Sequence, residues 1–159
     1  MTFTSRLLIK RTQPGQRQTV EHEGHLCFVN LRKNGLGGVI VGDHEYPERV
    51  AYTVLNQLLT EFESVHGDWG KQTVDMKCAF EPLDKAIIEY QDPAKADKIC
   101  KIQKDLDDTM DIMHKTIDNV LERGAKLDTL VEKSNDLSSQ SKAFYKTAKK
   151  ANSHCCVLQ

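Results

Sequence analysis

At 159 residues, the chain has room for one ordinary domain with an extension, or for one small domain and a long helix. It carries 22 basic and 23 acidic residues, and this balance argues against a general nucleic-acid-binding protein, which would show a basic excess. No run approaches the roughly 20 apolar residues needed to span a bilayer, and residues 1–11 lack the apolar core of a secretory signal. We therefore expect the chain on the cytosolic side of the cell, with reduced cysteines.

Helix-breaking residues divide the chain into two parts. All four prolines and eight of the nine glycines lie before residue 94, and after Pro93 the only breaker is Gly124. This distribution predicts a turn-rich N-terminal part followed by one long helix.

The N-terminal part begins with signals for one helix and three strands. The expected elements are a short helix at 2–10 and strands at 18–21, 25–32 and 36–41. Pro14-Gly15 predicts a turn after the helix. Lys33-Asn34-Gly35 predicts a hairpin, because Asn and Gly tolerate the positive φ that tight turns need.

A longer helix is expected after Tyr46-Pro47, because proline is favoured in the first turn of a helix. One face of this helix carries apolar residues at 3.6-residue spacing, namely Val50, Val54, Leu55, Leu58, Leu59 and Phe62. An extended stretch at 74–80 and a helix at 83–90 complete the N-terminal part. The result is a small α+β unit in which sheet and helices pack on one core.

From Ile99 onward, residues spaced alternately three and four apart form one continuous seam. The seam residues are Ile99, Ile102, Leu106, Thr109, Met113, Thr116, Val120, Arg123, Leu127, Leu130, Ser134, Leu137, Ser141, Phe144, Ala148 and Ala151. A mostly apolar stripe of this length is typical of a coiled coil, here about 80 Å long at 1.5 Å per residue. One helix alone cannot bury it, so partner helices are required.

Arg123 is the one charged residue of the seam. A buried guanidinium needs hydrogen-bond acceptors from facing helices, and such a residue fixes register and partner choice. Alternatively, Arg123 extends into solvent beside Gly124, as arginines near a seam often do. Taken alone, the residue does not separate these two interpretations.

The residues around Arg123 carry a specific resemblance. Residues 121–131 (LERGAKLDTLV) resemble the central signature of R-SNAREs, and Lys133-Ser134 and residues 139–146 (SQSKAFYK) continue it. Over 99–156 the chain most resembles the prenylated longin R-SNAREs of the Ykt-six type, in the synaptobrevin/VAMP-like superfamily. The resemblance implies a vesicular R-SNARE that drives intracellular membrane fusion by forming a four-helix bundle with three Q-SNARE helices.

The same resemblance assigns roles to the seam. It makes Arg123 the central ionic layer, which meets three glutamines from the Q-SNARE helices. It makes the apolar seam residues hydrophobic layers: Ile99, Ile102, Leu106, Met113, Val120, Leu127, Leu130, Leu137, Phe144, Ala148 and Ala151. Further implied partners are the SNARE-disassembly ATPase with its adaptor, a prenyltransferase, and a membrane. The implied location is the cytosol and the cytoplasmic face of Golgi, ER–Golgi vesicle and endosomal membranes.

The N-terminal part resembles a longin (profilin-like) domain, notably at residues 1–5 (MTFTS) and 43–47 (DHEYP). A longin domain normally opens with a β-hairpin, whereas this chain starts midway through the helix that follows. We therefore expect an incomplete longin-like domain at 1–92, with an exposed sheet edge. A linker at 93–98, the R-SNARE coiled coil at 99–152 and a lipidation tail at 153–159 follow it.

The five cysteines separate into two groups. Cys27, Cys78 and Cys100 are scattered, with no CxxC pair to suggest a metal or redox site. Cys156-Val157-Leu158-Gln159 fits the C-a-a-X prenylation pattern of the farnesylating type, and Cys155 is a candidate for palmitoylation. No cofactor is expected beyond these covalent farnesyl and palmitoyl groups.

Two lipids are expected to act together, since one lipid binds membranes only marginally and two anchor stably. Four lysines lie just upstream, namely Lys142, Lys146, Lys149 and Lys150. They either attract anionic lipid headgroups or form a solvated helix face, and the sequence leaves both interpretations open.

Zippering is expected to run from Ile99 toward Ala151 and to pull on the nearby anchor. Before assembly, the C-terminal segment should be disordered or folded back on its own N-terminal part. Four apolar residues off the seam are candidates for such a closed contact, namely Ile112, Ile117, Leu121 and Val131.

Other functional classes have less support. A prenylated coiled-coil adaptor without fusion activity is the main alternative. A small GTPase would need the phosphate-binding G-x-x-x-x-G-K-[ST] loop, which does not occur. His22-Glu23-Gly24-His25 lacks the spacing of the H-E-x-x-H zinc motif and is predicted to be a polar loop. No catalytic constellation is visible, so the chain is not expected to be an enzyme.

Overall fold

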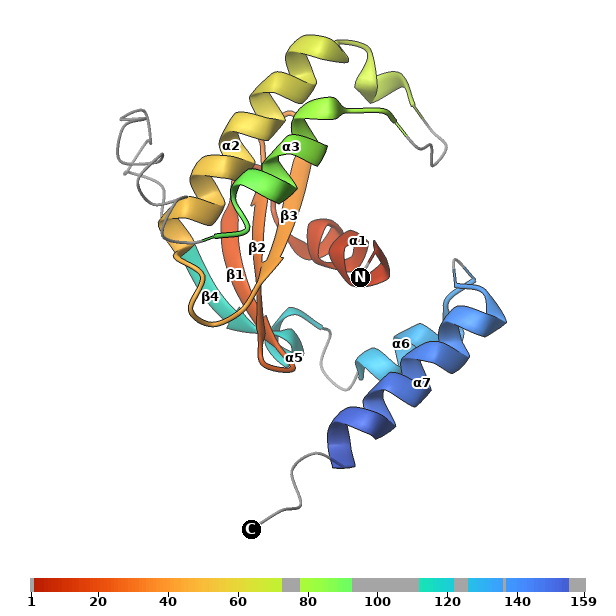
Figure 1. The fold of residues 1–159 in the computed structure, drawn as a ribbon. Coiled ribbons are helices and arrows are strands. Elements are labelled where there is room, and N and C mark those ends of the chain that lie inside the picture. The colour runs from red at the N-terminus through yellow and green to blue at the C-terminus, as the bar shows by residue number, and fades with distance from the viewer. Residues whose placement is uncertain (1, 73–77, 93–111, 122–125, 136, 155–159) are drawn as a thin grey trace.

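The computed structural model describes residues 2–72, 78–92, 112–121, 126–135 and 137–154. The N-terminal part contains α1 (Thr2–Arg11), β1 (Arg17–His22), β2 (His25–Leu31), β3 (Gly37–Gly42), α2 (Glu48–Val65), the 3-10 helix η1 (Trp69–Lys71) and α3 (Glu81–Glu89). The C-terminal segment contributes β4 (Ile112–Thr116), α5 (Ile117–Val120), α6 (Leu127–Lys133) and α7 (Ser139–His154). Figure 1 shows these elements in chain order.

One sheet joins the two parts of the chain. Its strand order is β3-β2-β1-β4, with antiparallel pairing among β1, β2 and β3. β4 is added in parallel to the outer edge of β1, so that Arg17 lies opposite Ile112 and Glu21 opposite Thr116. The C-terminal segment therefore covers one edge of the sheet, while β3 lies at its other end.

Both hairpin turns follow from the residues at their tips. Glu23 (φ 48°) and Gly24 (φ 76°) form the turn between β1 and β2. Of the polar loop predicted at residues 22–25, only these two residues form the turn, because His22 ends β1 and His25 begins β2. Gly35 (φ 90°) lies in the predicted turn before β3, where the side-chain oxygen of Asn34 accepts a hydrogen bond from the amide of Leu36. Gly24 and Gly35 adopt these positive φ values without a steric penalty, because glycine has no Cβ atom.

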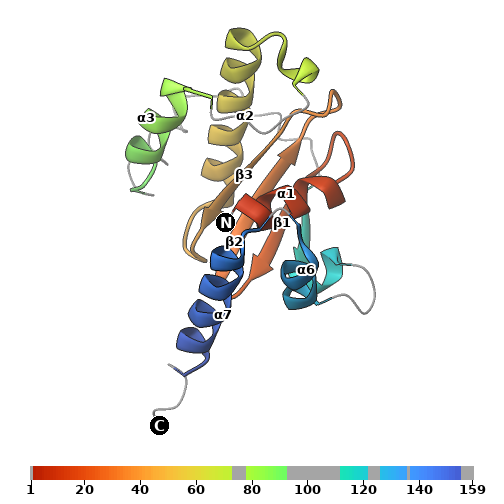
Figure 2. The ribbon, with the colours of Figure 1, turned by 90° about the vertical axis from the view of Figure 1, so that its right-hand side faces the viewer.

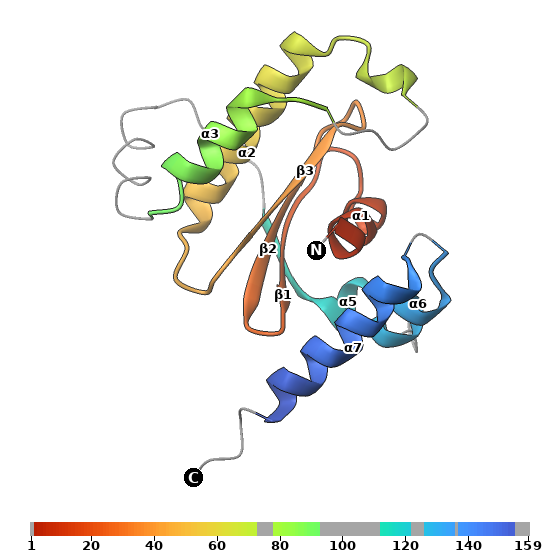
Figure 3. The same cartoon turned by 45° about the vertical axis from the view of Figure 1, so that its right-hand side comes forward.

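The sheet is covered on both faces because its strands alternate side chains between them. Phe28 of β2 packs with Ala51, Tyr52 and Leu55 of α2. Its neighbours Cys27 and Val29 face the opposite side, where they pack with Leu8 of α1 and with the C-terminal segment. Figure 3 shows α2 and α3 on one side of the sheet, and α1, α5, α6 and α7 on the other.

Helix α2 begins after Pro47, as predicted, and buries the expected apolar face. Its close approach to the sheet depends on Gly38, since a Cβ atom there would lie 3.0 Å from Cδ2 of Leu55. The helix at 2–10, the three strands and the helix at 83–90 are likewise found within two residues of their predicted bounds. Residues 73–77, in the stretch expected to be extended, lie outside the described residues.

The C-terminal segment differs from the single continuous helix that its seam predicts. Over the described residues it forms a strand, two short helices and α7. The physical reason is the absence of partner helices in the single chain. An unpartnered apolar stripe exposes its residues to water, whereas folding back buries several of them against the chain's own sheet.

Candidate functional site: the folded-back C-terminal segment

The C-terminal segment packs into the core beneath the sheet. Ile117, Leu121 and Val131 are 8%, 6% and 3% exposed, and they share one apolar cluster with Leu8 and Val20 of the N-terminal part. At roughly 1.5–3 kcal/mol for each fully buried aliphatic side chain, this burial contributes several kcal/mol to the folded-back state.

The residues predicted for a closed contact are confirmed. Ile117, Leu121 and Val131 lie in the cluster just described, and Ile112 of β4 packs against the cluster around Phe28 on the other face of the sheet. Apolar residues that lie off the seam in an assembled bundle are thus used to close the free chain.

The folded-back state also buries part of the seam itself. Val120 and Leu127 are buried, and Leu130 and Leu137 pack against the same cluster. Met113 is half-buried in β4. Partner helices therefore cannot reach Val120 and Leu127 while the segment remains folded back.

The seam face of α7 is different, because it points away from the core. Phe144 is 75% exposed, and Ala148 is also exposed. The remaining predicted site residues lie outside the described residues, namely Ile99, Ile102, Leu106, Arg123, Cys155, Cys156 and the side chain of Ala151.

The pairing of β4 with β1 also brings one side chain of β4 close to the start of α2. Nε2 of His114 lies 3.7 Å from a carboxylate oxygen of Glu48, at the start of α2. The second oxygen of Glu48 accepts a hydrogen bond from Thr19, whose hydroxyl lies 3.0 Å from that of Tyr52. Burial raises the pKa of Tyr52 to about 12, although the Thr19 hydrogen bond acts in the opposite direction.

Helices α6 and α7 form an antiparallel hairpin (Figures 2 and 3). Acidic side chains of α6 meet lysines of α7 across it. The hydroxyl of Tyr145 donates a 2.9 Å hydrogen bond to Oδ1 of Asp128, and Nζ of Lys149 donates to Oδ2. One turn further along α6, Glu132 lies 2.7 Å from Nζ of Lys146. Sequence reasoning did not find these contacts.

The acidic residues of the hairpin titrate below their ordinary range. The pKa of Asp128 is lowered by its hydrogen bonds with Lys149 and Tyr145, and the pKa of Glu132 is lowered by its hydrogen bond with Lys146. Burial and the neighbouring Asp128 carboxylate together raise the pKa of Tyr145, so its hydroxyl keeps the donor proton at neutral pH.

Acid is therefore expected to separate α7 from α6. A carboxyl group with a lowered pKa in the folded state contributes stability above its unfolded pKa, here 3.8 for Asp128 and 4.5 for Glu132. That contribution is lost as the pH falls through the lowered value. NMR signals of the Tyr145 ring, followed from pH 7 downward, should shift to solvent-exposed positions below this range. A D128N/E132Q variant should lack the transition, and contacts that persist at pH 2 would contradict the prediction.

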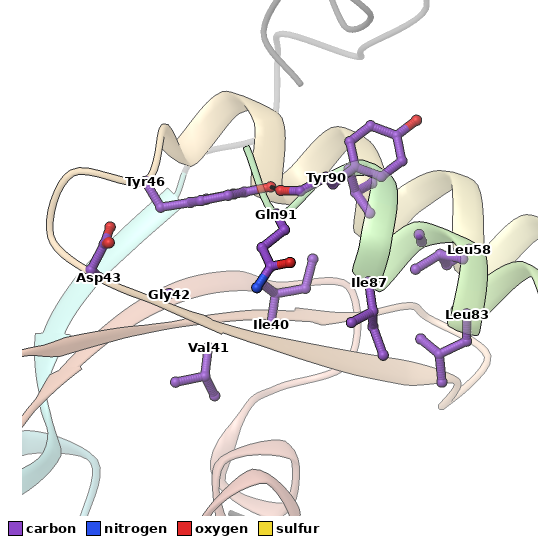
Figure 4. A pocket seen from close by; sticks show the side chains of 12 residues that line it. Ile40, Val41, Gly42, Asp43, Tyr46, Leu58, Leu83, Ile87, Tyr90 and Gln91 are labelled. Carbon is purple, nitrogen blue, oxygen red and sulfur yellow. Dashed lines mark hydrogen bonds between the residues drawn. The ribbon is translucent and has the colours of Figure 1, made fainter. Parts of the chain in front are cut away.

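An apolar pocket of about 340 Å³ lies between β3 and α3, on the face of the sheet that α2 covers. Figure 4 shows Leu83 and Ile87 on α3 pointing toward β3, and the Tyr46 hydroxyl donates a 2.9 Å hydrogen bond to the carbonyl of Tyr90. Asp43 is the only charged residue among those that line this pocket. The lining offers no set of acid, base and nucleophile on which to base a catalytic site.

Two family models match the two parts of the chain. The Longin model, described as a regulated-SNARE-like domain, matches residues 1–87, and the Synaptobrevin model matches residues 98–159. Together with the folded-back segment, these matches define the class: a SNARE with an N-terminal longin domain, which acts in membrane fusion and belongs to a non-enzymatic class.

The individual relatives agree with this class. The chain is 49% identical over 160 residues to "Synaptobrevin homolog YKT6" of Yarrowia lipolytica, covering 99% of this chain and 80% of the relative. It is 48% identical over 160 residues to "Synaptobrevin homolog ykt6" of Schizosaccharomyces pombe, with the same coverage. "VAMP-like protein YKT61" of Arabidopsis thaliana is 47% identical over 159 residues, with 99% of this chain and 79% of the relative covered. The chain belongs to the longin-containing synaptobrevin family of Ykt6 homologues.

Family membership confirms the predicted R-SNARE resemblance and implies Q-SNARE partners and association with membranes. None of the helices formed by the described residues is both long and apolar enough to cross a bilayer. The comparisons do not support the prediction of an N-terminally shortened longin domain, and the Longin match begins at residue 1.

Proposed function

We propose that this chain is a lipid-anchored R-SNARE that rests in a folded-back state and must open before it assembles. The burial of Val120 and Leu127 beneath the sheet carries this proposal, because both residues belong to the seam that partner helices have to contact. Seam residues that are buried in the same chain cannot contact partner helices at the same time. Opening is therefore a required step of assembly.

In the assembled state, residues 99–152 form one helix of a four-helix bundle. Arg123 forms the ionic layer with three glutamines of the Q-SNARE helices. The hydrophobic layers are those assigned from the seam, including Phe144 and Ala148, which the closed chain already exposes. The disassembly ATPase and its adaptor return the spent helix to the single chain, which then closes again on residues 1–92.

The membrane anchor is formed by a prenyl group on Cys156 and a palmitoyl group on Cys155, within the tail at 153–159. The short distance in sequence from Ala151 to Cys155 supports this assignment, since the final layers then pull directly on the lipid. A prenyl group alone leaves a soluble pool, and the second lipid fixes the chain on the cytoplasmic face of Golgi, ER–Golgi vesicle or endosomal membranes. Prenylation requires a cytosolic prenyltransferase as a transient partner.

The C156S variant tests the anchor. It is expected to lose nearly all membrane recovery in cell fractionation, because it can carry no prenyl group, whereas C155S should keep a partial and reversible membrane fraction. Unchanged membrane recovery of C156S would contradict the anchor.

Mixing with Q-SNARE helices tests the fusion role separately. The wild-type chain should form a heat-resistant complex with three Q-SNARE helices, and R123A should weaken that complex by leaving three glutamines without their shared partner. Recovery of homo-oligomers alone would instead favour a prenylated coiled-coil adaptor.

A further inference from the structure

Helix α7 is attached to the rest of the chain by polar contacts as well as by apolar packing. Its seam residue Phe144 is 75% exposed and points away from the core, so it contributes little to the folded-back state. On the neighbouring face of α7, Tyr145 reaches the apolar cluster under the sheet and donates its hydrogen bond to Asp128. Lys149 contacts the second oxygen of the same carboxylate. We call these three residues, Asp128, Tyr145 and Lys149, the Asp128 clasp.

The neighbouring contacts of the hairpin likewise join an acidic residue of α6 to lysines of α7. Glu132 of α6 meets Lys146 through its carboxylate, and its backbone carbonyl accepts a 2.8 Å hydrogen bond from Nζ of Lys142. On both turns of α6, therefore, an acidic residue faces lysines of α7. Asp128 differs from Glu132 because both of its oxygens are used and one partner, Tyr145, is half-buried.

The clasp cannot exist in an assembled bundle. Asp128 and Tyr145 are 17 residues apart and Asp128 and Lys149 are 21 apart in the sequence. On one continuous helix, a rise of 1.5 Å per residue would separate them by about 26 Å and about 32 Å. All three residues also lie off the seam, so the layers of the bundle do not use them.

We propose that the Asp128 clasp is a switch that sets the fraction of chains in which α7 is folded back, without taking part in the bundle itself. The effect on assembly rests on the proposed function, whereas the clasp itself is a contact within the free chain and can be tested without any partner. Breaking it releases α7 from α6 and removes the antiparallel hairpin that prevents residues 127–154 from continuing as one helix. Any change that neutralises Asp128, or separates it from Tyr145, then favours assembly.

The direct test is an intramolecular distance. Spin labels on non-canonical residues at Thr129 and Thr147, which are both exposed, leave the native cysteines unmodified. The folded-back wild-type chain should give a short distance, and an open helix should give about 27 Å at 1.5 Å per residue. D128N should raise the population of the long distance roughly three- to tenfold, because a charged acceptor of two hydrogen bonds is lost.

Matched variants separate the clasp from a general effect of charge. D118N removes one negative charge from the same segment, and Asp118 is exposed, so this variant should leave the distance distribution unchanged. Y145F keeps the ring but removes the donor, and it should open the hairpin by a smaller factor than D128N. The D128N/Y145F double variant should open it by less than the product of the two single effects, because both substitutions remove the same bond.

Equal distance distributions for D128N and D118N would contradict the proposed switch. It would also be contradicted if D128N/Y145F raised the population of the long distance by the full product of the two single effects. The association rate with three Q-SNARE helices provides the second measurement, in which D128N should be roughly three- to tenfold faster. The dissociation temperature of the finished complex should not change. A wild-type chain that forms no such complex would contradict the proposed function, whereas the distance measurement would still decide whether the clasp exists.

Discussion

Replacing Leu121 by alanine is expected to open the folded-back chain. The side chain is 6% exposed and lies in the cluster that joins α5 and α6 to Leu8 and Val20. Truncating a buried leucine costs about 2–4 kcal/mol, because apolar contacts are lost and a cavity remains. At about 1.4 kcal/mol per factor of ten, the ratio of closed to open chains should fall by roughly 30- to 1,000-fold.

Leu121 lies off the seam, so its truncation should destabilise the folded-back state without removing a layer of the proposed bundle. L121A should bind Q-SNARE helices faster than the wild type, until the open form predominates and the association rate reaches that of the open chain. Stopped-flow association and hydrogen exchange at the amides of α6 measure the two effects together. L83A is the matched control, because Leu83 lies on α3 at the other face of the sheet and is 46% exposed. Faster exchange at α6 without faster association would contradict the requirement for opening.

The N-terminal fold was predictable because its local signals agree with its tertiary packing. Pro47 and the apolar spacing that follows it predict α2, and Asn34-Gly35 predicts the turn before β3. Where propensity, periodicity and turn chemistry favour the same element, sequence reasoning places it within a residue or two. The covering of β1 by a strand from about 90 residues later had no such signal, since β4 pairs through its backbone.

The C-terminal segment was harder to predict because one sequence specifies two states. Its heptad spacing predicts the helix proposed for the assembled state, and that signal dominates residues 112–120, which form β4 and α5 in the free chain. The apolar residues left over from the seam did predict the closed contact, as Ile117 and Leu121 show. The clasp was missed because Asp128 and Tyr145 become neighbours only after the chain reverses between α6 and α7.

Alanine substitutions at two phenylalanines are expected to destabilise different states, F28A the free chain and F144A the complex with Q-SNARE helices. Phe28 is fully buried, and its ring lies against Tyr52 and Tyr46 with centroids 5.9 Å and 6.2 Å apart. F28A should lower the free energy of unfolding by about 3–5 kcal/mol. Since whole domains are stable by only about 5–15 kcal/mol, a large fall in the thermal midpoint follows. Ile112 packs on the same cluster, so β4 should also lose protection from hydrogen exchange.

Phe144 supplies the comparison, because F144A is the same chemical change at a residue that is 75% exposed. The free chain should lose less than about 0.5 kcal/mol, since the aromatic ring is already in water. The complex with Q-SNARE helices should instead dissociate at a lower temperature, because the proposed layer at Phe144 is buried only after assembly. Thermal unfolding of the free chain and thermal dissociation of the complex measure the two effects. A destabilised free chain with an unchanged complex would place Phe144 in the closed core, and would remove it from the layers of the bundle.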